Sequence, residues 1–360
     1  MSETNKLIVS PAPHISRPLT TRQVMLDVII ALVPAMAAGL FFFREKAAIL
    51  ILTAVLACVI SEYLCCLIRK QKSTIGDLSA VVTGVILAFS VSPNLPPAYI
   101  VIGSVFCIVI GKMVFGGLGD NPFNPAMLGR AFMTACFGMA MTTWSVPAVV
   151  PSQQPKIGAA NSYVTGQSGL DEDETLDVIT QATPLAWVKE AVKTRNLEDA
   201  SKIVKAGIAN SQLKAVFWGY TGGCLGETSA FALLLGGAYL LIRRTITWIV
   251  PVFVIGSAFV FAEIAYLVDS SAFVNPLVHI AGGGMLMAAF FIATDPVTNP
   301  VTRKGRMVFG AGVGLLIMLI RVFGAYPEGV MYAVLIMNAL SPLIDRMCKR
   351  KPYGGEPNAK

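Results

Sequence analysis

Residues 24–68 decide the fold class: they read VMLDVIIALVPAMAAGLFFF, then REK at 44–46, then AAILILTAVLACVISEYLCCLI. Each apolar run is about 20 residues long, which is the length that an α-helix needs to cross roughly 30 Å of hydrocarbon. The segment of three charged residues between the runs is only long enough to form a turn. The stretch therefore predicts two consecutive membrane spans.

The composition of the whole chain agrees with this interpretation. Of 360 residues, 55% are hydrophobic and only 14% are charged, and the mean hydropathy is +0.67. Soluble domains usually carry about 25% charged residues. These values exclude a soluble domain, a disordered chain, a disulfide-stapled secreted scaffold and a coiled coil. We predict an all-α polytopic membrane protein with almost no chain left for a soluble catalytic domain.

Further apolar windows along the chain bring the predicted number of transmembrane helices to about ten. They lie near residues 24–43, 47–68, 78–91, 98–115, 126–144, 228–242, 246–268, 277–293, 307–323 and 329–343. The windows at 78–91 and 228–242 are too short to cross the bilayer unaided, and each is bounded by Gly, Pro or an acid. Short or broken helices usually line a site in membrane proteins.

The windows divide the chain into five regions. These are a tail at 1–23, a first membrane half at 24–144, a long loop at 145–227, a second membrane half at 228–343 and a tail at 344–360. An uncleaved first span is expected, although Ala35-Met36-Ala37 has the form of a signal-peptide cleavage site, because the apolar run continues beyond it.

The Lys and Arg residues predict the orientation of these regions. Most of them, including Lys72, Lys112 and Arg243, fall in short segments on one side, whereas the opposite short loops hold only Arg44, Lys46 and Arg321. Short cytoplasmic loops retain cations. We therefore expect both tails in the cytoplasm and the loop 145–227 outside. The net charge of +7 is then a topology signal, and no nucleic-acid partner is expected.

An internal repeat appears at an offset of about 150 residues. The matching pairs are Asp77-Leu78-Ser79-Ala80 with Glu227-Thr228-Ser229-Ala230, Val101-Ile102-Gly103-Ser104 with Val254-Ile255-Gly256-Ser257, and Asn124-Pro125 with Asn275-Pro276. The copies begin three spans apart, so they enter the membrane from opposite sides. This predicts an inverted repeat whose broken helices meet near a pseudo-two-fold axis, similar to the architecture of urea transporters.

Polar residues beside these breaks are the candidate contacts within the membrane half. Asn121 and Asn124 lie in the helix-breaking run 116–125, where they can hold freed backbone groups or a polar ligand. Arg130 follows inside a span, where a guanidinium is costly unless it meets an anion or carbonyl groups. Asp295 stands at the cytoplasmic end of the eighth span and serves as a cap or a ligand contact.

Three other acids lie near the ends of spans. Asp27, Glu62 and Glu263 are expected to reach the membrane interface with their side chains. No set of residues has the spacing of a metal site, and two histidines, His14 and His279, do not supply a bis-histidine haem.

The long loop contains one presented hydroxyl of interest. In Ala182-Thr183-Pro184-Leu185, the proline favours an extended backbone at Thr183 and holds its hydroxyl away from local helical carbonyls. Taken alone, this is a common loop feature and not evidence for a cofactor.

Taken together, the motifs at 116–132, 226–229, 294–300 and 182–185 resemble one family over nearly the whole chain. It is the D subunit of the Rnf complex, the membrane-bound ferredoxin:NAD⁺ oxidoreductase. The B subunit of the sodium-translocating NADH:quinone reductase is similar but typically longer. The family pattern Ser/Thr-Gly-Ala-Thr has Gln181 here in place of the usual Gly.

The resemblance implies a flavin mononucleotide (FMN) joined by a phosphoester bond to Thr183. It also implies a second, noncovalent flavin such as riboflavin, for which Asn121, Asn124, Arg130 and Asp295 are the expected contacts. The chain would then be an electron-transfer subunit of the bacterial cytoplasmic (inner) membrane, coupled to Na⁺ or H⁺ movement. It would not be catalytic alone, because it needs partner subunits that carry flavin and iron–sulfur clusters.

Two other functions fit parts of the pattern. A small-solute channel or transporter with urea-transporter-like architecture explains the repeat but leaves the Ala182–Leu185 motif without a role. A scaffold whose polar motifs only pack helices predicts neither a bound flavin nor the transport of a solute.

Overall fold

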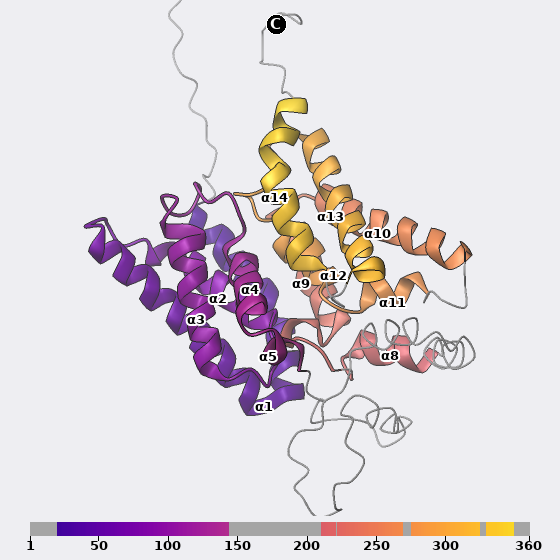
Figure 1. Ribbon diagram of the computed structural model, residues 1–360, viewed down its shortest axis with the longest axis horizontal. Coiled ribbons are helices and arrows are strands. Elements are labelled where there is room, and N and C mark those ends of the chain that lie inside the picture. The colour runs from indigo at the N-terminus through magenta and orange to yellow at the C-terminus, as the bar shows by residue number, and fades with distance from the viewer. Residues whose placement is uncertain (1–19, 144–209, 221, 269–274, 325–328, 349–360) are drawn as a thin grey trace, which may run out of the picture.

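The computed structural model describes residues 20–143, 210–220, 222–268, 275–324 and 329–348, and these residues are helical or in turns, with no strand among them. The predicted all-α class is confirmed for this part of the chain. In Figure 1 the helices of the first half lie beside those of the second half. The predicted loop 145–227 falls largely outside the described residues.

The first two predicted spans form one long element, α1 (Thr21–Ile68), which is interrupted at Arg44. Arg44 has φ 49° and ψ −123°, so the helix changes direction there and has two arms. A straight 48-residue helix would be about 72 Å long, more than twice the thickness of the hydrocarbon core. The Thr20 hydroxyl and the Gln23 side chain form a capping box at the start of the first arm.

The rest of the first half is built from shorter pieces. The 3₁₀ turn η1 (Ile75–Asp77) precedes α2 (Ser79–Phe89), and α3 (Pro97–Ile108) continues into a π-helical turn, η2 (Val109–Met113). Then come α4 (Pro125–Cys136) and α5 (Gly138–Thr142). The predicted window at 78–91 is therefore a short helix, and the window at 126–144 is broken.

The second half begins with the same succession of a 3₁₀ turn, a short helix and a longer helix. After α8 (Asn210–Trp218), the 3₁₀ turn η4 (Leu225–Glu227) precedes the short helix α9 (Ala230–Ile242), and α10 (Ile249–Val268) follows. The next predicted span is broken into α11 (Pro276–Ala281), α12 (Met285–Met287) and a second π-helical turn, η5 (Ala288–Ile292). The chain continues with α13 (Arg303–Phe323) and α14 (Val330–Met347).

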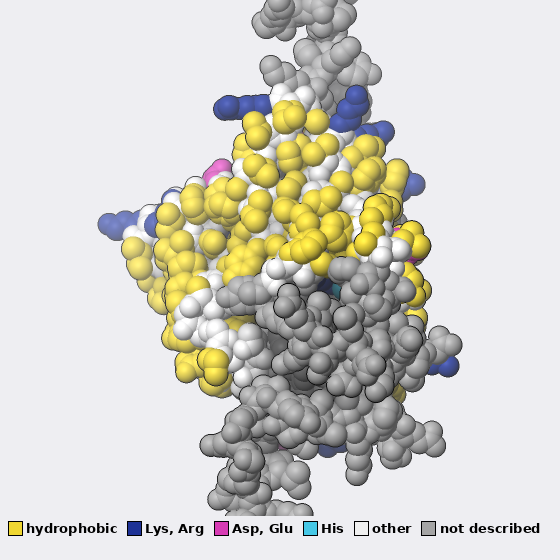
Figure 2. All heavy atoms as spheres, turned by 45° about the vertical axis from the view of Figure 1, so that its right-hand side comes forward, with side chains coloured by type: hydrophobic (Ala, Val, Ile, Leu, Met, Phe, Trp, Pro, Cys, Tyr) yellow, Lys and Arg dark blue, Asp and Glu magenta, His cyan; other side chains and the backbone are white. Residues whose placement is uncertain are grey.

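Four helices in the described ranges are long and apolar enough to cross a membrane: α1, α10, α13 and α14. Shorter apolar helices occupy Ser79–Phe89, Pro97–Met113 and Ala230–Ile242. Figure 2 shows hydrophobic side chains over most of the described surface in that view, with Lys and Arg side chains toward its edges. A membrane protein is therefore confirmed, while ten crossings and a urea-transporter-like arrangement stay predictions.

Candidate functional site

The two halves of the repeat meet where α2 ends and η4 begins. The Leu225 N–H donates to the Val91 carbonyl (3.1 Å), and the Cys224 thiol donates to the Ser90 carbonyl (3.3 Å). Carbonyl groups at the end of α2 have no partner within their own helix. The segment that leads into α9 supplies donors to two carbonyl groups beyond the end of α2.

Arg130 lies at this junction. Its helix, α4, has Asn124 as its N-cap, and Arg130 is 5% exposed within the helix. The guanidinium donates to the Cys224 sulfur at 3.4 Å, and the Arg130 carbonyl accepts from the Thr134 hydroxyl at 2.9 Å. The contact joins the first half of the chain to the segment that starts α9. Arg130 is therefore a cationic residue held at the meeting point of the two halves.

Asn121 and Asn124 hold the turn that begins α4. The Asn121 amide donates to the Phe123 carbonyl (3.0 Å), and its oxygen accepts from the Gly119 N–H (3.4 Å). The Asn124 oxygen accepts from the Met127 N–H (3.2 Å), and Pro125 takes the first helical position. Both side chains are buried, and these hydrogen bonds engage them with local backbone groups.

The equivalent motif in the second half has the same local structure. Asn275 is the N-cap of α11, where its oxygen accepts from the Leu277 N–H at 2.9 Å, and Pro276 again takes the first helical position. The Arg321 guanidinium donates to the carbonyl groups of His279 (2.6 Å) and Gly282 (3.3 Å) beyond the short helix. Arg321 is 5% exposed, so it stabilises the helix break and does not lie free in an outer loop as expected.

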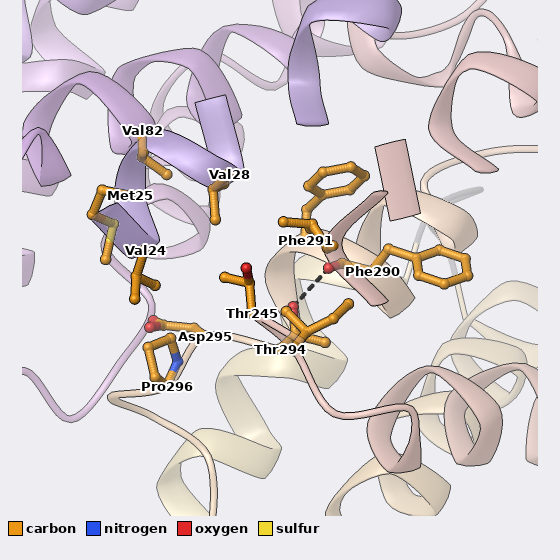
Figure 3. Close-up of a pocket in the computed structure, with 12 residues that line it drawn as sticks. Val24, Met25, Val28, Val82, Thr245, Phe290, Phe291, Thr294, Asp295 and Pro296 are labelled. Carbon is orange, nitrogen blue, oxygen red and sulfur yellow. Dashed lines mark hydrogen bonds between the residues drawn. The ribbon is translucent and has the colours of Figure 1, made fainter. Parts of the chain in front are cut away.

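Asp295 borders a separate, small cavity of about 50 Å³, enough for a few water molecules. Figure 3 shows Val24, Met25 and Val28 of α1 on one side of it and the η5 segment with Phe290 and Phe291 on the other. The lining is thus mostly apolar, with Asp295 and two threonines as its polar groups.

The carboxyl group of Asp295 lies beyond η5, outside the helices. It accepts hydrogen bonds from the Val297 N–H (3.2 Å) and the Thr298 hydroxyl (3.5 Å). Burial raises the pKa of Asp295 to about 6, and these two hydrogen bonds oppose part of that rise. The side chain is therefore a group that changes charge near neutral pH beside an apolar cavity.

Asp27 lies close to the same cavity, because it contacts Thr245, which is one of the lining residues. Its carboxylate accepts from the hydroxyl groups of Thr245 (2.9 Å) and Tyr239 (3.3 Å) and from the Arg243 guanidinium (3.4 Å). Asp27 is 6% exposed and binds the end of α9 to α1, while its expected place at the membrane interface stays a prediction.

The predicted contact residues therefore lie in three places. Asn121 and Asn124 form the start of α4, Arg130 lies at the junction of the halves, and Asp295 borders the cavity near α1. Within the described ranges, the hydrogen bonds of Asp295 go to Val297 and Thr298 and do not reach the other three residues. Thr183 lies outside those ranges, and so does its motif.

Sequence reasoning missed a buried ion pair. The Lys112 ammonium is 2.7 Å from the Glu62 carboxylate, with the side chains 1% and 0% exposed. Lys112 was expected only as one of the cations on the cytoplasmic side, and Glu62 as a residue reaching the interface, and neither expectation included their pairing. The only sequence signal was the presence of one acid and one base inside apolar windows, 50 residues apart.

Comparison with known proteins assigns the chain to a family. A model of the NQR2, RnfD, RnfE family matches residues 8–354. The chain belongs to this family.

Named relatives within the family match over nearly their full length. The chain is 37% identical over 352 residues to the D subunit of the proton-translocating ferredoxin:NAD(+) oxidoreductase complex of Clostridium ljungdahlii, covering 97% of each chain. It is 38% identical over 358 residues to the D subunit of the Na(+)-translocating ferredoxin:NAD(+) oxidoreductase complex of Acetobacterium woodii, covering 98% of this chain and 97% of that one.

A third relative also matches over nearly its full length. It is the D subunit of the ion-translocating oxidoreductase complex of Escherichia coli, 36% identical over 354 residues, with 96% of this chain and 98% of that one covered. The resemblance to Rnf D subunits is therefore confirmed. The relatives' names give different coupling ions, a proton and Na⁺, so membership in the NQR2, RnfD, RnfE family does not fix the ion.

Proposed function

We propose that this chain is a membrane electron-transfer subunit that carries FMN on Thr183 within an Rnf complex. The observation that carries the proposal is the match to the D subunits of ion-translocating complexes over 96–98% of the chain. The presented hydroxyl of Ala182-Thr183-Pro184-Leu185 supplies the attachment group. Electron flow through the complex is coupled to movement of Na⁺ or H⁺.

The bound FMN supplies the one- and two-electron chemistry, and the chain supplies attachment and position. A phosphoester bond prevents the loss of a flavin that lies outside the bilayer. Other subunits, carrying a flavin and iron–sulfur clusters, provide the chemistry of ferredoxin and NAD⁺. In this proposal the chain lies in the bacterial inner membrane with both tails in the cytoplasm and the loop 145–227 outside.

We also propose a second, noncovalent flavin such as riboflavin near the broken helices. Asn121, Asn124, Arg130 and Asp295 remain the proposed contacts. Arg130 is the first to test, because it is a cationic group at the junction of the two halves, whereas the two Asn side chains are engaged by local backbone.

Replacement of the attachment residue tests the covalent flavin. Thr183→Ala removes the hydroxyl, so we expect loss of in-gel flavin fluorescence at the mass of this subunit. Thr183→Ser keeps a hydroxyl at the same position and should retain fluorescence. Thr175→Ala, a change eight residues away and outside the family pattern, is the control for disturbance of the loop. Undiminished fluorescence in Thr183→Ala would exclude this attachment site.

Gln181 provides a second comparison. Gly is usual at this position in the family pattern, and Gly gives the backbone more freedom than Gln. Gln181→Gly should therefore retain or increase the fraction of chains that carry flavin, measured as flavin absorbance per chain after denaturation and precipitation.

A further inference from the structure

One side of α10 is not covered by the rest of the described chain. Residues 252, 256, 260, 263 and 267 are spaced by three or four positions, so they lie on one side of the helix. Val252, Gly256, Val260 and Leu267 are exposed and Glu263 is partly buried, and we call these five residues the α10 face. The opposite side of α10 packs against α13. In Figure 1, α10 lies at the right-hand edge of the second half, where the bilayer or another protein can reach it.

Glu263 brings a carboxyl group onto this otherwise apolar face. Its side chain makes no hydrogen bond or ion pair with any residue in the described ranges. Its helix, α10, is long and apolar enough to cross a membrane. An ionisable group within a membrane span is costly unless it meets a partner. The described chain therefore does not supply the partner that the position of Glu263 requires.

The direction of the side chain works against escape to the nearer end of the helix. Five residues of α10 follow Glu263, which is about 7 Å of helix. Side chains on an α-helix lean toward its N-terminus, so the carboxyl group is directed over the preceding turn, which contains Phe259 and Val260. This direction leads away from the end of the span. A polar group on a neighbouring chain is then the direct way to satisfy the carboxyl group.

Gly256 leaves a gap in the same face, seven residues before Glu263. A methyl group added at Gly256 would meet nothing within 4 Å. Gly lowers helix stability relative to Ala, and small residues in membrane helices let a neighbouring helix approach closely. The gap at Gly256 is therefore suited to a helix that packs against α10 and carries a polar group opposite Glu263.

The first copy of the repeat fills the equivalent gap with its own chain. Gly103 of α3 matches Gly256, and a methyl group added at Gly103 would lie 2.3 Å from the Met133 sulfur of α4. Seven residues after Gly103, the first copy has the exposed residue Ile110 where the second copy has Glu263. The second copy thus differs from the first in two ways that both favour a partner helix: its gap is open, and its surface carries an acid.

A second copy of this chain does not fit the α10 face. A symmetric contact uses the same surface on both copies, so it would bring Glu263 toward the Glu263 of the other copy. The α10 face itself contains no Lys or Arg that could pair with the acid. Lipid tails offer no donor to a carboxyl group either. The chemistry of the face fits a different membrane helix that carries a cationic side chain.

We propose that the α10 face binds a transmembrane helix of another subunit, with a Lys or Arg of that helix paired with Glu263 and its backbone close to Gly256. The pair fixes the depth and the rotation of the partner helix, and the gap sets how closely it approaches. This inference rests on membership in a complex, which is part of the proposed function. It does not depend on the flavin at Thr183.

Photo-crosslinking within the complete complex tests the contact. Benzoylphenylalanine in place of Val260 lies one turn from both Gly256 and Glu263, and irradiation links it to the group that it touches. We expect a link to a peptide, identified by mass spectrometry, from a transmembrane segment of another subunit that contains Lys or Arg. The same link should form in Thr183→Ala, so the result is separate from that of the flavin test.

Glu263→Leu tests the proposed ion pair. In the complex it should weaken the link at position 260 and speed the loss of the partner from the detergent-solubilised complex by roughly fivefold, the effect of one polar contact between membrane helices. Glu263→Asp keeps the carboxyl group and should retain most of the link. In the isolated chain Glu263 has no partner to lose, so Glu263→Leu should unfold at the same temperature as wild type or a higher one. A residue that only stabilises the fold would lower that temperature.

Gly256→Leu tests the gap independently of the acid. The added side chain fills the space that the partner helix is proposed to occupy, so both the link at position 260 and the amount of retained partner should fall. Gly138→Leu is the matched control, because it adds the same side chain at a helical glycine on α5 that also has nothing within 4 Å of an added methyl. The control should match wild type.

The outcomes are distinct. A link to a span containing Lys or Arg that weakens in Glu263→Leu and Gly256→Leu but persists in Glu263→Asp would support the proposal. An intact complex in which position 260 links only to lipid or to a second copy of this chain, or links equally in wild type and Glu263→Leu, would overturn it and leave the flavin proposal standing. A wild-type chain that purifies from native membranes without other subunits would contradict both this inference and the proposed function.

Discussion

Asp295 is the residue whose dependence on pH follows most directly from its surroundings. Burial beside the cavity raises its pKa to about 6. The folded protein therefore keeps this proton at pH values where the unfolded chain, with a pKa near 3.8, has released it. The stabilisation of the folded state by the proton bound to Asp295 is complete below pH 3.8 and is lost as the pH rises to about 6.

Asp295→Asn tests the direction of this pH dependence of stability. The amide stays neutral and can accept from the Val297 N–H, so the variant should be more stable than wild type at pH 8 and similar at pH 4. A shift of two pKa units corresponds to at most about 3 kcal/mol. Thermal unfolding of the purified chain at both pH values gives the measurement. The same gain in melting temperature at pH 4 and pH 8 would contradict the assigned pKa.

Single residues also show where sequence reasoning reached its limit. Helix capping depends on neighbours in the sequence, so Asn124 was expected to hold backbone groups freed at the helix break, and it caps α4. The pairing of Glu62 with Lys112 depends on how α1 packs against η2, and nothing within either window specifies it. The role of Thr183 rests on family resemblance and lies outside the described residues.

At the scale of elements, the two short helices pack against different arms of α1. A methyl group added at Gly84 of α2 would lie 2.8 Å from the Val55 Cα in the second arm. One added at Gly236 of α9 would lie 2.1 Å from the Ala31 carbonyl oxygen in the first arm. The break at Arg44 thus lets one long element support both copies of the repeat.

Gly236→Ala is expected to destabilise the protein because the added methyl meets backbone, which cannot rotate away. Overpacking of this kind typically costs about 1–3 kcal/mol. Gly256→Ala on α10 is the matched control, since nothing lies within 4 Å of its added methyl. Ala also favours helix over Gly, so the control should be neutral or slightly stabilising. Thermal unfolding in detergent compares the two, and equal melting temperatures would contradict the close packing.

The elements themselves were largely predictable because helix length and apolar content are local properties. The windows at 78–91 and 228–242 correspond to short helices, α2 and α9, and the turn at 44–46 corresponds to the break in α1. The π-helical turns η2 and η5 were not predicted. They depend on contacts with neighbouring helices, which leave no simple periodic signal in the sequence.

At the scale of the whole molecule, the direction of α1 decides how many times the chain crosses the membrane. If the break at Arg44 lies at the outer surface, the arms cross separately, and five crossings precede the loop 145–227. If α1 crosses the membrane only once, Arg44 and its charged neighbours do not lie at the outer surface. The contact of Lys46 with Asn94 (2.9 Å), which precedes α3, places this turn beside another inter-helix loop.

Reporter fusions distinguish these topologies. Alkaline phosphatase needs disulfides and is active only outside the cytoplasm. We expect activity for fusions after Glu45 and after Gly169, and none for a fusion after Lys360, where a fluorescent protein should mature instead. Two crossings by α1 place Glu45 outside, and an even total places both tails together in the cytoplasm. An active phosphatase at Lys360 would require an odd number of membrane crossings and would contradict the predicted ten. An inactive phosphatase at Glu45 would show that the charged turn is not an outer loop.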